Sequence, residues 1–180
     1  MCEVRVKRRK KGERLDAVGP LHALANKKLL ALTGPGRSIE VEITALSPSD
    51  AALSLAQAEL TNALSAIKQR RRPPRQQPNQ MCVVLWLTVG ALRVMLGADL
   101  EHVPGVTEGW RAIVSSAERP EGRAGFFKVP HHGSPDADCP ECWAELLSRQ
   151  PIAVLTPFSP ARRPRSEDLD RLCAQTKQVY

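Results

Sequence analysis

The chain has 180 residues, a formal net charge of +7 and 42% hydrophobic residues. Its length and composition predict a single globular domain with one core of its own. No apolar run approaches the ~20 residues of a membrane-spanning helix, and the basic run near the N-terminus is followed by no apolar segment of a signal peptide. We therefore expect neither a membrane protein nor a secreted one. Five scattered cysteines, an odd number, favour reduced thiols and a cytoplasmic location.

Positive charge is concentrated in the first 80 residues, which carry 15 Lys and Arg against 7 Asp and Glu, whereas residues 81–180 carry 11 against 12. Two clusters cause much of the excess, one from Arg5 to Arg14 and one from Arg70 to Arg75. Such clusters can bind phosphates and release counterions, so nucleic acid is a candidate partner. The alternative is a solvated basic arm (residues 1–20) and a mobile Arg/Pro loop (residues 70–80), because neither cluster contains aromatic side chains to stack on bases.

Residues 21–69 predict a strand and a long helix. Residues 21–32 fit a short helix or a helix-to-strand transition, and residues 39–44 alternate between apolar and polar as in a half-exposed strand. The segment Ser47-Pro48-Ser49-Asp50 is a helix-start signal, and the helix should end before Arg70 because prolines follow. Apolar residues recur inside it at helical spacing and predict one face packed against a sheet: Leu53, Ala56, Leu60, Leu64 and Ile67.

Two later segments place possible metal ligands where buried strands end. Apolar runs at residues 81–89 and 91–96 flank Gly90 and predict a β-hairpin, which ends in Gly97-Ala98-Asp99. A further apolar run stops at Pro130 and is followed by His131 and His132. Carboxylate and imidazole together are usual ligands of zinc, manganese or iron. Each segment alone has a plainer interpretation, namely a capping Asp and a His pair in an exposed turn.

The remaining elements alternate between helix and strand. We expect a helix over residues 106–116, with Trp110, Ile113 and Val114 facing the sheet, and another that begins at Pro140. A short strand over residues 152–155 and a final helix capped by Ser166 complete the pattern. The inner stripe of that helix would be Leu169, Leu172 and Cys173, and a last strand would begin at residue 178.

Residues 83–101, the segment from Lys128 to Ser134, and residues 140–180 together resemble the C-terminal half of metallo-β-lactamase-fold hydrolases. The resemblance is strongest to the hydrolase domain of competence DNA-uptake proteins, and it covers roughly 140 residues, a usual domain length. It implies an α/β (α+β) fold, half of a four-layer αββα sandwich in which helices flank a mixed sheet. It also implies zinc, one or two ions in a complete site. Asp99 would bridge the metals, with His131 as a further ligand and His132 in reserve.

One part of the family pattern is missing. The family's first metal motif, His-x-His-x-Asp-His, is not formed by any of the four histidines, which are His22, His102, His131 and His132. A two-metal hydrolase needs more ligands than Asp99 and one or two imidazoles. The resemblance therefore implies the second half of a hydrolase, incomplete or inactive alone. The sheet face meant for the missing half would favour self-association or a partner chain that completes the fold.

Two alternatives compete with the hydrolase hypothesis. Cys139-Pro140-Glu141-Cys142 with a nearby His could close a small structural zinc site, although Cys142 could instead lie on the buried face of a helix. His102, three residues after Asp99, could act as a supporting or substitute ligand. The second alternative is a degenerate, non-catalytic module that binds nucleic acid or a partner chain through its basic N-terminal half.

Overall fold

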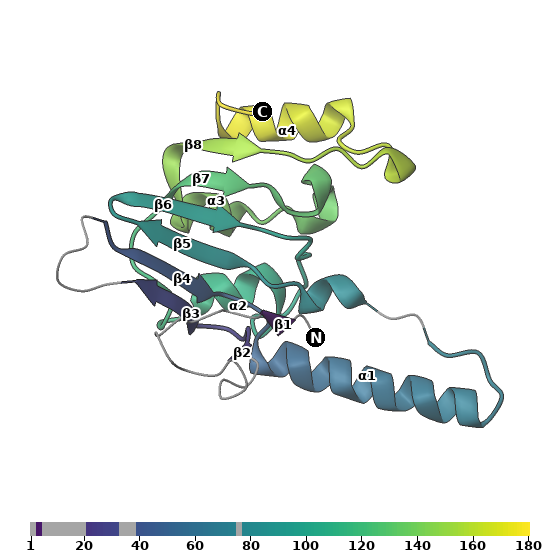
Figure 1. The fold of residues 1–180 in the computed structure, drawn as a ribbon. Helices are drawn as coiled ribbons and strands as arrows, with labels where there is room; N and C mark the ends of the chain where they lie inside the picture. The colour runs from purple at the N-terminus through teal and green to yellow at the C-terminus, as the bar shows by residue number, and fades with distance from the viewer. Residues whose placement is uncertain (1–2, 5–20, 33–38, 75–76) are drawn as a thin grey trace.

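The computed structural model describes residues 3–4, 21–32, 39–74 and 77–180. The described residues form an α+β fold with a mixed six-stranded sheet and four α-helices (Figure 1). The strands are β1 (Glu3–Val4), β2 (Leu21–His22), β3 (Lys27–Leu32), β4 (Val41–Ala45), β5 (Leu85–Val89), β6 (Leu92–Leu96), β7 (Ala124–Lys128) and β8 (Leu147–Val154). The helices are α1 (Asp50–Lys68), α2 (Gly109–Ser115), α3 (Pro140–Glu145) and α4 (Ser166–Gln175). Short 3-10 turns are η2 (Pro78–Met81), η3 (Pro130–Gly133), η4 (Pro135–Ala137) and η5 (Ser159–Ala161).

The sheet runs in the order β3-β4-β5-β6-β7-β8, so every strand pairs with its neighbour in the sequence. The pairs from β3 to β6 are antiparallel, whereas β6, β7 and β8 are parallel. Parallel neighbours need a crossover connection, and α2 and α3 lie in the two crossovers. The carboxyl ends of β6 and β7 therefore lie at the same edge of the sheet, where ligands commonly bind in folds with parallel strands.

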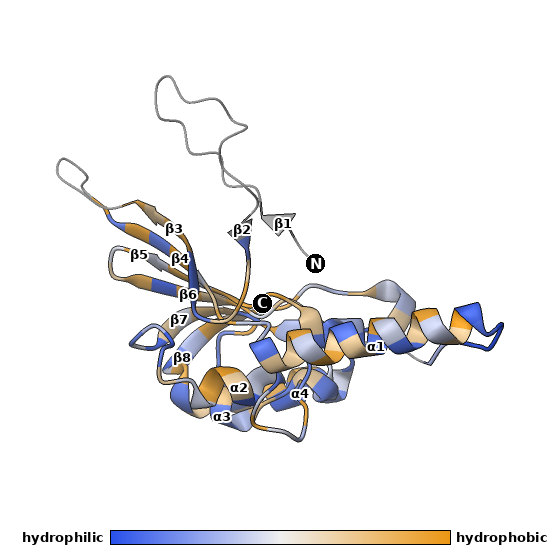
Figure 2. Cartoon of the chain, turned by 90° about the horizontal axis from the view of Figure 1, so that it is seen from below, coloured by the Kyte–Doolittle hydropathy of each residue, from blue (hydrophilic) through white to orange (hydrophobic). Residues whose placement is uncertain are grey.

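One face of the sheet is covered by α2, α3 and α4 (Figure 2). Trp86, Met95 and Phe127 stand opposite one another on β5, β6 and β7 and are almost completely buried. Trp110 of α2 packs edge-on against Phe127, with ring centroids 6.2 Å apart and planes at 81°. The Trp110 Nε1–H group also donates to the Leu100 carbonyl at 2.9 Å, so the core fixes the loop that follows Asp99.

The opposite face of the sheet is less well covered. A continuous apolar row crosses it on consecutive strands, and its members are only partly buried or exposed: Ile43, Leu87, Val94, Phe126 and Ile152. A small cluster of Ala23, Leu29 and Ala45 packs with Ile43 and Leu85 near β3. Within the described ranges, no helix lies on this face (Figure 2). The row is therefore a partly covered apolar strip, which we call the open sheet face.

The N-terminal half confirms some predictions and corrects others. The strand β4, the hairpin β5–β6 and the helix α1, with Ser49 as its N-cap, form where the sequence predicts them. The prediction of a short helix within residues 21–32 is wrong, because β2 pairs with β1 and β3 pairs with β4 along a ladder whose register shifts between Lys28 and Leu30. The basic arm lies largely outside the described residues, and the predicted Arg/Pro loop ends in η2.

The helix α1 does not pack one face against the sheet, contrary to the prediction. It extends away from the sheet (Figure 1), and only its Ala52 and Ala63 are buried. Of the apolar residues at helical spacing, Leu53 and Ala56 are partly buried, and the other three are exposed, with 55% for Leu60, 51% for Leu64 and 57% for Ile67. Periodicity correctly predicts an apolar face, but it does not specify what that face contacts.

The C-terminal half follows the predicted order, with shifted boundaries. The helix α2 begins at Gly109 rather than residue 106, and α3 ends at Glu145 because the fully buried Leu147 starts the long strand β8. Arg165, rather than Ser166, is the N-cap of α4, since the Asp168 carboxylate accepts the Arg165 N–H at 2.9 Å. Leu172 is buried as predicted, but Leu169 and Cys173 are exposed. Among the described residues, no helix combines the length and hydropathy needed to span a bilayer.

Candidate metal centre

The ends of β6 and β7 bring the predicted ligands together. The Gly97 N–H donates to the Lys128 carbonyl, and the His131 N–H donates to the Ala98 carbonyl, each at 3.0 Å. These two backbone hydrogen bonds continue the pairing of β6 and β7 beyond the strands. They hold the loop of Asp99 beside the turn of His131 and His132.

Asp99 lies nearest to His132. The Asp99 Oδ1 atom is 4.0 Å from His132 Nε2, and both side chains are partly exposed. His132 Nδ1 is 2.7 Å from the Thr156 carbonyl oxygen, which can only accept, so Nδ1 carries the proton. The neutral ring then has its lone pair on Nε2, the atom nearest to Asp99. A carbonyl that fixes the tautomer in this way is usual around metal-binding histidines.

His131 faces a different carboxylate. Its Nδ1 atom is 3.4 Å from Glu101 Oε1, and it is buried with no hydrogen-bond partner among the described residues. Glu101 Oε1 also accepts a hydrogen bond from Asn79 Nδ2 at 2.8 Å. The geometry thus favours His132 over His131 as the partner of Asp99. Sequence reasoning did not single out Glu101, although its place two residues after Asp99 was a usable signal.

The turn that carries the two histidines has an unusual backbone. His131 has φ 45° and His132 has φ 56°, and Gly133 follows with φ 79°. Residues other than glycine pay of order 1 kcal/mol for the left-handed region. The positive φ of Gly133 favours glycine, and a Cβ atom there would also lie 2.7 Å from Leu155 Cδ2 and displace that side chain. Such backbone strain persists where the surrounding structure over-determines it, often at functional sites.

A buried ionic network on α4 supports this turn. Arg171 donates to the Gly133 carbonyl and also contacts Asp138, whose Oδ2 is 3.1 Å from Arg171 Nε. The Asp168 carboxylate binds Arg171 at 3.3 Å and Arg163 at 2.7 Å. Burial alone would raise the pKa of Asp168, but the Arg165 N–H and the two guanidinium groups outweigh it and lower the pKa. The network therefore holds Asp168 ionised and ties α4 to the histidine turn.

Two further contacts shape the surroundings of the Asp99–His132 pair. The Phe158 ring stacks on the His132 ring, with centroids 4.9 Å apart and planes at 16°, and restricts its rotation. Burial lowers the pKa of Lys128 at the end of β7, and the negative charge of Asp99 partly opposes this shift. A lysine cation thus lies within electrostatic reach of the carboxylate.

The Asp99–His132 pair fits part of a metal site. Zinc binds carboxylate oxygen and imidazole nitrogen at about 2.0–2.2 Å, which places two tetrahedral ligands about 3.4 Å apart. The observed distance of 4.0 Å between Asp99 Oδ1 and His132 Nε2 is longer than that separation, and side-chain rotation can close the difference. A catalytic zinc site normally has three protein ligands, so this pair supplies two of them.

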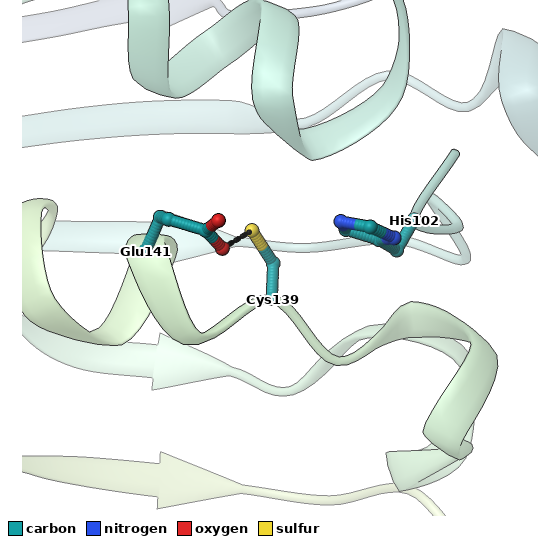
Figure 3. A group of neighbouring side chains, drawn as sticks. All are labelled: His102, Cys139 and Glu141. Carbon is teal, nitrogen blue, oxygen red and sulfur yellow. Dashed lines mark hydrogen bonds between the residues drawn. The ribbon is translucent and has the colours of Figure 1, made fainter. Parts of the chain in front are cut away.

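A second group of possible ligands lies elsewhere. His102, Cys139 and Glu141 each offer one ligand atom, and these atoms all lie within 4.8 Å of one another (Figure 3). Burial raises the pKa of the Cys139 thiol to about 11. The sequence pattern suggested a pair of Cys139 and Cys142; both are buried in the core, but Cys142 does not belong to this group.

The chain was compared with models of protein families, with curated proteins and with solved structures. None of them matches it. Any assignment of function therefore depends on the arrangement of residues described above.

Proposed function

We propose that this chain contributes metal ligands to a metal-dependent hydrolase of the metallo-β-lactamase superfamily. The observation that carries the proposal is the approach of Asp99 and His132 to 4.0 Å at the ends of neighbouring parallel strands. The fixed tautomer of His132 adds support, because its Nε2 lone pair is available towards the carboxylate.

The residues of the site have separate roles in this proposal. Asp99 and His132 bind the metal, and Thr156 and Phe158 orient His132. A bound zinc ion would polarise a phosphoryl or acyl oxygen and lower the pKa of a bound water. The Lys128 cation would favour an anionic substrate such as a phosphodiester. The His131–Glu101 pair lies beside the ligands, with Nδ1 and Oε1 3.4 Å apart.

The open sheet face supports the further proposal that the sheet is half of a four-layer αββα sandwich. In a sandwich of this type, the inner faces of two sheets pack together, and helices cover the outer faces. Helices cover one face here, and the other carries the apolar row that includes Val94 and Phe126. A second sheet, from another chain or another copy, would cover this row and supply the missing histidines.

Zinc titration of the full chain tests the proposal. The measurements use a Cys139→Ser background, so that the thiol cannot bind the metal. We expect Asp99→Ala and His132→Ala each to weaken zinc binding at least tenfold, and the exposed Asp170→Ala control to leave it unchanged. Equal affinity for the Asp99 and His132 variants and their parent, or no zinc binding by the parent, would overturn the assignment.

A second candidate function is that of a non-catalytic module that binds nucleic acid. The supporting observation is that Arg70, Arg71 and Arg72 are all exposed where α1 ends. Three phosphate contacts would make the affinity for duplex DNA fall with salt, with a slope of about −3 in a double-logarithmic plot. A triple Arg→Gln variant should lose that slope, and binding without salt dependence would refute this candidate.

A further inference from the structure

A mixed set of metal-type side chains lies outside the Asp99–His132 pair. His102 comes from the loop after β6, whereas Cys139 and Glu141 come from the start of α3 (Figure 3). Two separate segments of the chain thus converge on one point. The Cys139 side chain is buried, and the other two are partly exposed, so an ion could enter from solvent.

The backbone fixes the two segments relative to each other. The His102 N–H donates to the carbonyl of Asp136, in the turn η4, at 2.7 Å. The Cys142 N–H donates to the Cys139 carbonyl at 3.0 Å and starts the helical turn that carries Glu141. These hydrogen bonds anchor the loop of His102 to η4 and the N-cap residue Cys139 to the first turn of α3, as a preformed site requires.

Helix capping does not explain the arrangement. Cys139 is the N-cap residue of α3, but its side chain makes no capping hydrogen bond. The thiol instead donates to Glu141 Oε2 at 3.2 Å. The other oxygen of that carboxylate, Oε1, lies 3.5 Å from the Arg111 guanidinium. Arg111 thus lies beside Oε1, while Oε2 faces the thiol.

The donor set indicates the class of ion. Imidazole nitrogen, thiolate sulfur and carboxylate oxygen together suit zinc and other late divalent transition metals, whereas magnesium and calcium need oxygen ligands. A neutral His102, a Cys139 thiolate and a Glu141 carboxylate carry two negative charges, which a divalent ion balances. Binding breaks the S–H bond of Cys139, forms a metal–sulfur bond and releases one proton to solvent.

We propose that His102, Cys139 and Glu141 form a divalent transition-metal site that uses none of the Asp99–His132 ligands. The ligand atoms lie within 4.8 Å of one another and must approach to about 3.4–3.8 Å around a tetrahedral ion. Three protein ligands leave the fourth coordination position open for water or a small anion. Catalytic zinc sites have this composition, whereas structural zinc sites have four protein ligands.

Cobalt(II) titration of the full chain tests this site, because a cobalt–thiolate bond has a near-ultraviolet charge-transfer absorption. We expect the absorption in the wild type and in the Asp99→Ala/His132→Ala double variant. Cys139→Ser should abolish it, and His102→Ala should weaken cobalt binding at least tenfold. The exposed Cys173→Ser serves as the matched control and should keep the full signal.

Two outcomes would overturn the proposal. One is the absence of a thiolate–cobalt absorption in the wild type at millimolar cobalt. The other is a signal that survives in Cys139→Ser or disappears in Cys142→Ser, since either result would assign the thiolate to another residue. Circular dichroism of each variant separates loss of the site from loss of the fold, and His102→Ala removes a partly exposed ring that the core does not need.

Discussion

Replacing Asp168 with Asn should destabilise the chain far more than its position on a surface helix suggests. The Asp168 side chain is almost completely buried and accepts hydrogen bonds from Arg163 at 2.7 Å, the Arg165 N–H at 2.9 Å and Arg171 at 3.3 Å. Asn keeps the shape and one acceptor oxygen but removes the charge. Arg163 then loses its carboxylate partner, while Arg171 retains its contact with Asp138.

The expected size of the effect follows from burial. Removing one partner of a buried ion pair costs about 3–5 kcal/mol. The side chains of Arg163 and Arg171 are 17% and 26% exposed, so water can partly replace the carboxylate. We therefore expect about 3 kcal/mol less free energy of unfolding. In a protein of this size, that loss lowers the Tm by roughly 6–12 °C.

Urea unfolding followed by circular dichroism at pH 7 measures this difference. Asp170→Asn, on the exposed side of the same helix, is the control and should change the free energy of unfolding by less than about 0.5 kcal/mol. The pKa of Asp168 is lowered in the native state, so its stabilisation is present above the ordinary pKa of Asp and disappears as the pH falls through the native value. Asp168→Asn should thus approach the wild type in acid. A loss at pH 7 no larger than that of Asp170→Asn would refute the reasoning.

Three further predictions concern the histidine turn, the open sheet face and the cysteines. Arg171→Ala removes the donor to the Gly133 carbonyl, so calorimetry should show zinc binding at the Asp99–His132 pair weakened several-fold. Arg171→Lys should restore only part of the zinc affinity. Unchanged zinc binding by Arg171→Ala would contradict a positioning role. Light scattering should detect self-association of the wild type, and Ile152→Lys on the open sheet face should reduce it. Leu169→Lys on α4 is the matched control and should not, since the two residues are 37% and 38% exposed. A wild type that stays monomeric at high concentration would contradict self-association through the open sheet face. Iodoacetamide at pH 8 should alkylate the exposed Cys173 and spare Cys139. Burial raises the pKa of Cys139 to about 11, so this side chain stays a thiol until the pH rises past that value. Equal labelling of the two cysteines by mass spectrometry would contradict the prediction.

The sequence predicts the strands that deliver the candidate ligands, because local signals mark their ends. Gly97 and Pro130 interrupt apolar runs, and the side chains two residues after them, Asp99 and His132, come together in the structure. The choice between His131 and His132 could not be predicted, since it depends on left-handed backbone angles at both residues. The tautomer of His132 depends on Thr156, which comes from a distant segment.

Other features depend on contacts between distant segments and were missed for that reason. Glu101 faces His131 while it accepts a hydrogen bond from Asn79, 22 positions earlier in the chain. His102 and Cys139 meet only because the crossover through α2 brings the start of α3 beside the loop after β6. Residues 27–32 have weak local preferences, so pairing with β4 determined their conformation as a strand.

Anomalous diffraction at the zinc absorption edge, from crystals of the full chain grown with zinc, tests the central claim most directly. The account predicts a peak between Asp99 Oδ1 and His132 Nε2, about 2 Å from each atom. Well-ordered Asp99 and His132 side chains with no anomalous peak between them, or a peak bound by His131 and Glu101 instead, would contradict it.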